Sequence, residues 1–239
     1  MPDIRKHRGA HPEDRKLFSD DQLPALRDAV NELSWLLTRN YSMKGAVKLV
    51  GDRHALTDRQ RLALSRAACS DQSKTRRAST RVEFEELEAA HLIIDGFNLI
   101  ITIEAGLSGG VLFVCRDGCI RDLSSVHGSY RSVDETEDAI RLIGASLAAL
   151  KAKSVSWLLD RPVSNSGRLA TRLRDCAEQN NWPWTVETAF NPDREIVLSD
   201  RIVISSDGPL LDQVTHWTNL NRHLIEKRLD TPWLVDLSC

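Results

Sequence analysis

The sequence predicts a three-layer α/β domain with a parallel sheet, preceded by a small all-helical domain. From about residue 91 onward, short apolar runs alternate with longer amphipathic stretches. Fully apolar runs of this length are typical of parallel strands that helices cover on both faces. Before residue 82, apolar residues recur at steps of three and four, which is the helical period. We therefore assign residues 1–82 to the helical domain and residues 83–239 to the α/β domain.

The composition is that of an ordinary globular protein, with 239 residues, 41% hydrophobic and 28% charged. No apolar stretch approaches the roughly 20 residues of a membrane span, and the charged first residues lack the apolar core of a secretory signal. We therefore expect no membrane partner. The five cysteines are an odd number at scattered spacings, which favours reduced thiols in a cytoplasmic protein over a disulfide framework.

Three helices are expected in the first part, each behind a residue that can cap it. Ser19 precedes the first helix, which extends to about residue 39 on an apolar stripe. Ser42 precedes the second, which Gly51 would end, and Thr57 precedes the third, over residues 58–69. The basic residues 70–81 are expected to form either a linker or an exposed helix.

In the second part, the apolar runs predict a series of strands. They cover residues 91–94, 111–114, 119–121, 155–159, 184–186 and 202–204, and residues 233–237 could add a last one. Asp117 and Gly118 separate the second and third runs and predict a hairpin. Helices are expected through residue 105, over residues 134–150 and 168–177, and from Pro209.

Three of these strands end on an acid: Asp95, Asp160 and Asp207. Open parallel sheets bind their ligands outside the carboxyl ends of the strands. If the strands are neighbours, the three carboxylates repel one another unless a cation neutralises them. Oxygen ligands of this kind suit Mg²⁺ or Mn²⁺. The alternative is that each aspartate is a loop residue that caps the following helix.

Two of the strand-end motifs resemble those of the PIN-like nucleases, in particular their NYN branch. Residues 93–98 look like the first-strand motif of that superfamily, and residues 204–212 look like its later strand-to-helix acid motif. The whole chain resembles an uncharacterised prokaryotic two-domain family, whose landmarks match residues 8–12, 50–53, 67–71, 127–131 and 160–167. The resemblance implies a PIN-like, Rossmannoid α/β fold and metal-dependent hydrolysis of RNA.

On this resemblance, Asp95, Asp160 and Asp207 would hold the metal directly or through water. Asn98 would orient Asp95 or contact a phosphate, and Asp212 would be a fourth, more distant metal ligand. The family usually carries another acid on a central helix, for which we choose Glu137 over its neighbours Asp134 and Asp138. Acids in the first turn of a helix also complement the helix dipole without any metal.

Two further segments are candidates for substrate contacts. Ser164, Asn165, Ser166 and Arg168 open a helix behind a strand, where free N–H groups and hydroxyls suit a phosphate, although an ordinary helix cap explains the serines as well. His127, Ser129, Tyr130 and Arg131 gather polar groups within one loop, with base stacking by Tyr130 and phosphate binding by Arg131. Arg161, directly after Asp160, completes the set of predicted substrate contacts.

Other functions are less consistent with the sequence. Phosphatases of the haloacid-dehalogenase type need an acid two residues after the first aspartate, where this chain has Phe97. No P-loop, dinucleotide or nucleophile-elbow motif occurs. Arg59, Arg61 and Arg66 could bind RNA phosphates from the helical part, or could simply be solvated. We therefore expect a metal-dependent ribonuclease; the alternative is a non-catalytic RNA- or nucleotide-binding regulatory protein.

Overall fold

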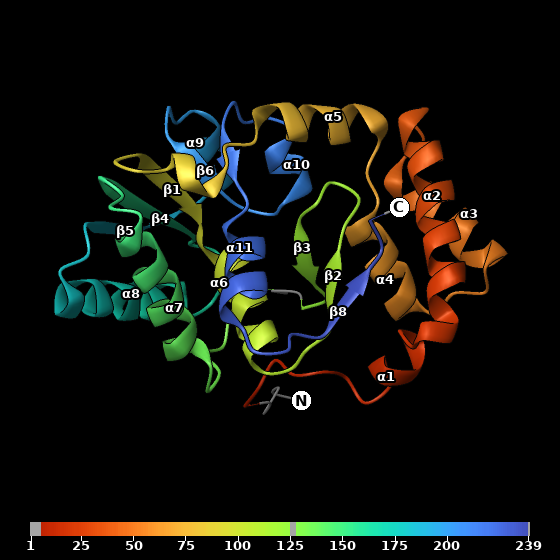
Figure 1. The fold of residues 1–239 in the computed structure, drawn as a ribbon, viewed down its shortest axis with the longest axis horizontal. Helices are drawn as coiled ribbons and strands as arrows, with labels where there is room; N and C mark the ends of the chain where they lie inside the picture. The colour runs from red at the N-terminus through yellow and green to blue at the C-terminus, as the bar shows by residue number, and fades with distance from the viewer. Residues whose placement is uncertain (1–5, 125–127, 239) are drawn as a thin grey trace.

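The computed structural model describes residues 6–124 and 128–238 of the chain. Helices gather at one end of the molecule and a five-stranded sheet lies at the other, with a three-stranded sheet between them (Figure 1). The architecture is thus α/β, with a helical amino-terminal region and a parallel sheet behind it, as the sequence predicts.

The helical region contains the expected helices and two additions. Its elements are α1 (Asp14–Leu17), η1 (Asp20–Gln22), α2 (Leu23–Thr38), α3 (Met43–Arg53), α4 (Asp58–Ala67) and α5 (Asp71–Thr80). Ser42, Thr57 and Ser70 cap α3, α4 and α5 through their hydroxyl groups. The basic segment that could have been a linker is therefore a helix.

Two boundaries in this region differ from the expectation. Ser19 makes no capping hydrogen bond, and the turn η1 separates it from α2. Gly51 does not end α3 but lies within it. A Cβ atom at Gly51 would lie 2.6 Å from Cζ of Arg61, so the glycine leaves room for the guanidinium of this α4 residue to lie against α3.

The main sheet has the strand order β5-β4-β1-β6-β7, and all of its neighbours pair in parallel. Its strands are β1 (His91–Asp95), β4 (Ser154–Asp160), β5 (Trp184–Ala189), β6 (Ile202–Ile204) and β7 (Trp217–Thr218). β7 was not predicted, because two residues are too short for an apolar run to be recognised.

Helices cover both faces of this sheet. On one face, Leu92, Ile94, Trp157 and Leu159 share a core with α6 (Gly96–Leu107), α7 (Thr136–Ala149), α8 (Ser166–Asn180) and α11 (Leu220–Arg228). On the other face, Ile93 and Leu158 pack beneath the short helices α9 (Pro192–Val197) and α10 (Gly208–Leu211). The alternation of side chains along each strand therefore assigns odd-numbered residues of β1, including Asp95, to the face under α9.

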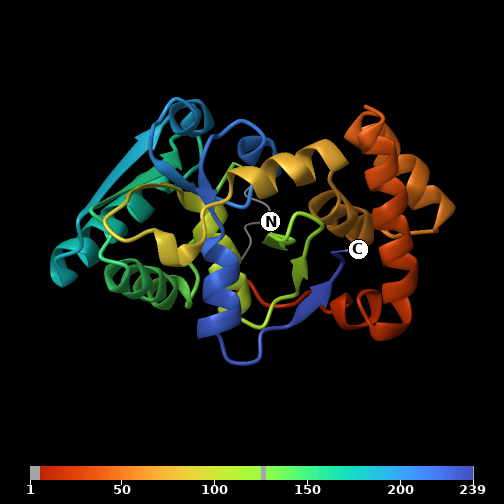
Figure 2. The ribbon, with the colours of Figure 1, turned by 45° about the horizontal axis from the view of Figure 1, so that its top comes forward.

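The second sheet joins the two parts of the molecule, as Figure 2 shows from another side. β2 (Leu112–Val114) and β3 (Ile120–Asp122) form the predicted hairpin, and β8 (Leu234–Asp236) pairs with β2 in parallel. The last predicted strand thus forms, but in this sheet and not in the main one. Phe113 and Val235 share a core with Leu26, Leu33 and Leu64 of the helices, so the helical region packs directly against the second sheet.

Four cysteines lie within the described residues, and all four are buried and free: Cys69, Cys115, Cys119 and Cys176. In the same part of the chain, none of the helices combines the length and the apolar character that crossing a bilayer requires.

Candidate active site at the carboxyl ends of the strands

The register of the main sheet brings the strand-end aspartates to one edge. Asp95 pairs with Leu158 across β1 and β4, so Asp160 lies one pleat beyond Asp95 on the neighbouring strand. β6 pairs with β1 on its other side, and Asp207 lies in the turn after β6. Asp193, near the start of α9, follows β5. Four neighbouring strands thus each deliver one aspartate to this edge.

The two serines after β6 form hydrogen bonds with Asp95, the last residue of β1, and with Asn98 of α6. The hydroxyl of Ser205 donates to Oδ2 of Asp95 over 2.9 Å and accepts the N–H of Asp207 over 2.9 Å. Oδ1 of Asn98 accepts from the backbone N–H of Ser206 at 2.7 Å and from its hydroxyl at 2.8 Å. These hydrogen bonds join the turn after β6 to the end of β1 and the start of α6, and they hold the carboxylate of Asp95 in a fixed orientation.

Asp95 and Asp207 each have one carboxylate oxygen that makes no hydrogen bond with a described residue. Oδ1 of Asp207 accepts from the N–H of Leu210 over 3.0 Å and so caps α10. The other oxygen of Asp207, and Oδ1 of Asp95, form no hydrogen bond with another described residue. These oxygens are the free acceptors of the site.

Gly96 allows α6 to begin directly behind Asp95. A Cβ atom at this position would lie 2.9 Å from the backbone oxygen of Leu158 and 2.5 Å from Cδ2 of Leu159. Real Cβ atoms do not approach other atoms this closely, so a larger residue would push α6 away from β4. Glycine therefore keeps the positive end of the α6 dipole beside the aspartate, where it favours negative charge.

The pKa values of Asp95, Asp160 and Asp193 are all raised, first of all by burial. Burial first, and then the charges of Asp207, Asp193 and Asp160, raise the pKa of Asp95 to about 7, although the hydrogen bond from Ser205 opposes the shift. Burial also raises the pKa of Asp160. The pKa of Asp193 is raised by burial and then by the charges of Asp207 and Asp160. The four groups therefore lie close enough to repel one another.

None of these four aspartates forms an ion pair with Lys, Arg or His within residues 6–124 and 128–238. The two fully buried acids Asp14 and Glu104 do have such partners, Arg59 and Arg8, whereas the strand-end aspartates are half-buried or, for Asp193, exposed. A group of like charges without a counterion costs stability. Binding a cation at this edge would remove that cost.

The donors at this edge have the chemistry of a ligand set for a hard cation, although no metal cage is preformed. Within the described chain, no group of three or more His, Cys, Asp or Glu side chains is arranged to hold a metal. Mg²⁺ is usually held by one or two carboxylates and completes its coordination with waters and substrate phosphates. Asp95 and Asp207, each with a free oxygen, are compatible with such an open site.

A buried ion-pair network lies behind the turn that carries Asp207. The carboxylate of Asp117 lies 2.6 Å from the guanidinium nitrogens of both Arg77 and Arg121. Nε of Arg121 also donates to the backbone oxygen of Ser206 over 2.6 Å. Arg77 packs against Gly208, where a Cβ atom would lie 2.9 Å from its Nη2. The network therefore supports the turn after β6 from the side of the helical region.

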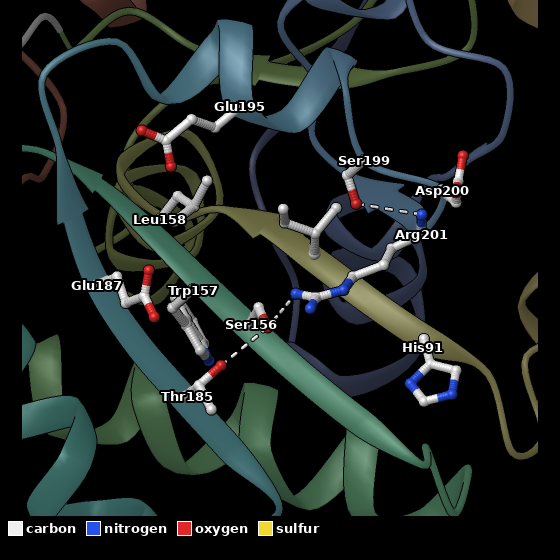
Figure 3. A pocket seen from close by; sticks show the side chains of 11 residues that line it. His91, Ser156, Trp157, Leu158, Thr185, Glu187, Glu195, Ser199, Asp200 and Arg201 are labelled. Carbon is white, nitrogen blue, oxygen red and sulfur yellow. Dashed lines mark hydrogen bonds between the residues drawn. The ribbon is translucent and has the colours of Figure 1, made fainter.

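A separate groove of about 730 Å³ opens along β4 and β5 on the sheet face that α9 covers (Figure 3). Ser156 and Thr185 line its floor and share a hydrogen bond of 2.8 Å, and Arg201 donates to the hydroxyl of Ser156. Glu187 and Glu195 stand at its walls. Because its arginine is already engaged and its walls are acidic, the groove is poorly suited to an anionic substrate.

Comparison with known families places the chain. The family model described as "Domain of unknown function (DUF5616)" matches residues 84–223, which is more than half of the chain. The chain belongs to this family. All four strand-end aspartates lie in the matched segment. A second family model, described as "Protein of unknown function (DUF434)", matches residues 25–79, in the helical region.

A similar protein is the archaeal "Uncharacterized protein MJ0935" of Methanocaldococcus jannaschii. It is 27% identical over 190 residues, which cover 77% of this chain and 91% of the relative. These matches confirm the expected uncharacterised family with two parts. No solved structure matches the chain, so the PIN-like subtype of the fold stays a prediction.

Asp212 and Glu137 are each bound by other side chains of the protein. Both oxygens of Asp212 accept from Arg77, each at 2.8 Å, and the hydroxyl of Ser73 donates to one of them at 3.0 Å. Its charge is thus already compensated, which does not support the expected metal ligand. Glu137 accepts from the thiol of Cys176 at 3.3 Å and pairs with Arg141 at 3.4 Å. This geometry gives Glu137 a place between α7 and α8 instead.

Tyr130 is buried, with 1% of its surface exposed, and therefore cannot stack on a base as the sequence suggested. Its hydroxyl donates to Oε1 of Glu104 over 2.6 Å, and burial followed by the charge of Glu104 raises the pKa of Tyr130 above its usual range. Arg8, from the beginning of the chain, pairs with the same glutamate. The tyrosine thus belongs to a buried polar cluster behind α6.

The two predicted substrate segments lie side by side, but several of their groups bind each other. Ser129 and Ser164 form a parallel bridge, and the side-chain amide of Asn165 donates to the backbone oxygen of Tyr130 over 2.8 Å. Ser166 is buried at the start of α8. The exposed basic residues among the candidates are Arg131, Arg161 and Arg168. His127 lies outside the described residues.

Two of the three arginines of α4 are also engaged within the protein. Arg59 pairs with the buried Asp14, and Arg61 lies 2.8 Å from Asp52 and donates to the backbone oxygen of Leu56 over 2.9 Å. Nε of Arg66 is buried. This geometry gives no support to a basic RNA-binding surface on α4.

Asp193 was not among the candidates, although it follows a strand as the other three aspartates do. The prediction ended the strand at residue 186, whereas β5 continues to Ala189. Asn191 and Pro192 then begin α9, with the side chain of Asn191 as its cap. An Asn-Pro pair is a recognised helix-start signal, and together with the longer strand it could have pointed to Asp193.

Proposed function

We propose that this protein is a metal-dependent nuclease that hydrolyses RNA phosphodiester bonds at the strand-end aspartates. The observation that carries the proposal is the group of Asp95, Asp160, Asp193 and Asp207, which share one edge of a parallel sheet and have no basic partner among the described residues. A cation and the phosphodiester that it binds are ligands that such a set of carboxylates would accept together.

The motifs of the sequence support the same chemistry. The segment of Asp95 and Asn98 and the segment of Ser205 and Asp207 are the two by which the chain resembles PIN-like nucleases. Hydrogen bonds from Ser205 to Asp95 and from Ser206 to Asn98 join these segments. Two motifs that lie far apart in the sequence are therefore in direct contact at this edge of the sheet.

In this proposal, Asp95 and Asp207 hold Mg²⁺ or Mn²⁺ through the oxygens that make no internal hydrogen bond. Such an ion supplies an activated water and neutralises charge on the phosphodiester. Ser205 and Asn98 keep the Asp95 carboxylate and the β6 turn in position. Asp160 and Asp193, which both lie on the β4–β5 side of this pair of metal ligands, would bind the cation through water.

The test is cleavage of labelled single-stranded and structured RNAs with Mg²⁺ or Mn²⁺. We expect cation-dependent cutting by the wild type, and a loss of at least about a hundredfold in Asp95→Asn and in Asp207→Asn, because each removes a charged ligand. Asp28→Asn, on the exposed side of α2, is the matched control and should cut like the wild type.

Equal cutting by wild type and Asp95→Asn would mean that the activity comes from a contaminant or another site, and would contradict the proposal. A wild type that binds Mn²⁺ and RNA without cutting would instead favour the non-catalytic RNA- or nucleotide-binding alternative. Folding of each variant is checked by its thermal transition, so that loss of activity is not confused with unfolding.

A further inference from the structure

The residue after β5 is an exposed aromatic side chain at the same edge of the sheet. Phe190 leaves 73% of its surface in solvent, and Arg161, directly after β4, places its Cζ 4.7 Å from the centre of the ring. A single exposed apolar residue needs no explanation. An exposed phenylalanine on which a guanidinium stacks is a more specific feature, because both groups are ones that bind nucleotides.

The backbone around this pair is held on both sides. The N–H of Arg161 donates to the backbone oxygen of Ala189 over 2.7 Å, which extends the pairing of β4 with β5 by one step. On the other side, Pro192 is buried at the start of α9, and Asn191 caps that helix. Phe190 is therefore displayed from a short segment fixed at both ends, so little conformational entropy is lost when a ligand stacks on it.

The pair also lies next to the strand-end aspartates. Arg161 follows Asp160 directly, and Phe190 precedes Asp193 by three residues. Arg161 forms no ion pair with any described residue and lies over the ring instead. Its N–H groups thus remain available to an anion beside a site that is otherwise acidic.

We propose that Phe190 and Arg161 form a platform for single-stranded RNA, on which an unpaired base stacks against Phe190 while Arg161 binds the neighbouring phosphate. This inference rests on the proposed function, and it specifies the substrate as single-stranded. In a duplex, both faces of each base are covered by the neighbouring bases, so an exposed aromatic side chain can stack only on a base that is unpaired and accessible.

Leu198 provides a matched control for the stacking role. It directly follows α9 and is exposed to 74%, but its aliphatic side chain has no ring on which a base could stack. Replacing Leu198 with alanine removes exposed apolar area from the opposite end of the same short helix. A general effect of surface hydrophobicity would therefore affect both variants alike, whereas a stacking platform depends on Phe190 alone.

The experiment measures equilibrium binding of a fluorescein-labelled single-stranded RNA decamer by anisotropy, with Mg²⁺ present and RNA integrity checked on a gel. The duplex of the same sequence serves as the comparison probe. We expect tighter binding of the single strand, and a loss of about 5- to 150-fold in Phe190→Ala. Phe190→Trp should retain binding, and Leu198→Ala should leave it unchanged. Arg161→Gln should lower the salt dependence of log Kd by about 0.7.

Single-strand binding that is the same in Phe190→Ala and wild type would overturn the platform, and so would an equal loss in Leu198→Ala. Failure of the platform can be told apart from failure of the nuclease. If RNA cutting depends on Asp95 and RNA binding does not depend on Phe190, the nuclease proposal is supported and the platform is rejected. Binding that depends on Phe190 without any cutting would leave the platform standing without hydrolysis.

Discussion

The strand-end aspartates and the ion-pair network behind them handle buried negative charge in opposite ways. In the network, Asp117 is surrounded by the guanidinium groups of Arg77 and Arg121. Burial alone would raise the pKa of Asp117, but the two arginines outweigh burial and hold its pKa well below the usual range. At the strand ends, burial and then the charges of three acidic neighbours raise the pKa of Asp95 to about 7, and among the described residues the partner that opposes this shift is the hydroxyl of Ser205.

The network acid contributes to the stability of the fold, whereas the strand-end acids reduce it. A buried carboxylate with two guanidinium partners has most of its desolvation cost offset. The desolvation cost of a carboxylate that lies among other carboxylates is not offset. Groups that destabilise the fold in this way are typical of functional sites. The two regions are in contact, since Arg121 donates to the backbone of the β6 turn.

The largest expected effect comes from breaking the network. Asp117→Asn leaves the buried guanidinium groups of Arg77 and Arg121 without that counterion, and we expect a loss of about 3–5 kcal/mol in the free energy of unfolding. Urea unfolding at pH 7.5 measures it. Asp28→Asn, on the exposed surface of α2, should change stability by less than about 0.5 kcal/mol; a loss as small in Asp117→Asn would contradict the structural role of the network.

The same residue predicts a pH dependence. Because the pKa of Asp117 is lower in the folded than in the unfolded protein, its stabilisation is present above the ordinary pKa of 3.8 and is lost as the pH falls below it. Urea midpoints measured from pH 5 down to pH 3 should therefore fall less steeply in Asp117→Asn than in the wild type. Parallel curves would mean that Asp117 is not preferentially ionised in the folded state.

The second effect has the opposite sign. Without divalent cations, Asp95→Asn should stabilise the protein by about 1–3 kcal/mol at pH 8, because it removes the cost of ionising a buried carboxyl among like charges. The folded pKa of about 7 lies above the ordinary 3.8, so wild-type stability is lost as the pH rises through that window. Urea unfolding in EDTA at pH 5 and pH 8 measures both. A destabilised Asp95→Asn at pH 8 would contradict the raised pKa.

A smaller effect is expected from the cation itself. At a concentration ten times its Kd, Mn²⁺ or Mg²⁺ should stabilise the wild type by about 1.4 kcal/mol, which corresponds to a rise in Tm of roughly 3–6 °C for a chain of this size. EDTA should reverse the rise, and Asp207→Asn should abolish it. Thermal unfolding followed by circular dichroism measures the shift, and an equal shift in Asp207→Asn would locate the cation elsewhere.

The smallest effect should be that of Asp193→Asn. Much of the surface of Asp193 is exposed, so water screens the burial and repulsion that raise its pKa. The substitution should therefore change the free energy of unfolding by less than about 0.5 kcal/mol in EDTA. If Asp193 contributes to the cation site through water, the same variant should weaken the Mn²⁺-induced rise in Tm. An unchanged rise would limit the site to the aspartates after β1, β4 and β6.

The sequence was sufficient to predict the class of the fold and three of the four clustered aspartates. Apolar runs identify buried parallel strands, and parallel strands share their carboxyl edge, so acids at the ends of such runs meet. Asp193 was missed because β5 is an edge strand, and its partly exposed side chains hide where the strand ends.

Other roles could not be predicted, because they depend on partners far along the chain. Asp212 lies in the same motif as Asp207, but its charge is balanced by Arg77, 135 residues earlier. Tyr130 has a polar hydroxyl but is buried in the fold, because Glu104 on α6 accepts a hydrogen bond from that hydroxyl. The run at residues 233–237 predicts a strand, but a short apolar run does not specify which sheet edge it will join.

The core shared by the helices and the second sheet bears on how the two family segments can be separated. One match ends at residue 79 and the other begins at residue 84, which suggests a natural point to divide the chain. However, Phe113 of β2 and Val235 of β8 pack against Leu26 and Leu33 of α2. A cut at this point would leave each piece with an uncovered apolar face. During synthesis, the core of the helices would likewise be complete only after β8 has been made.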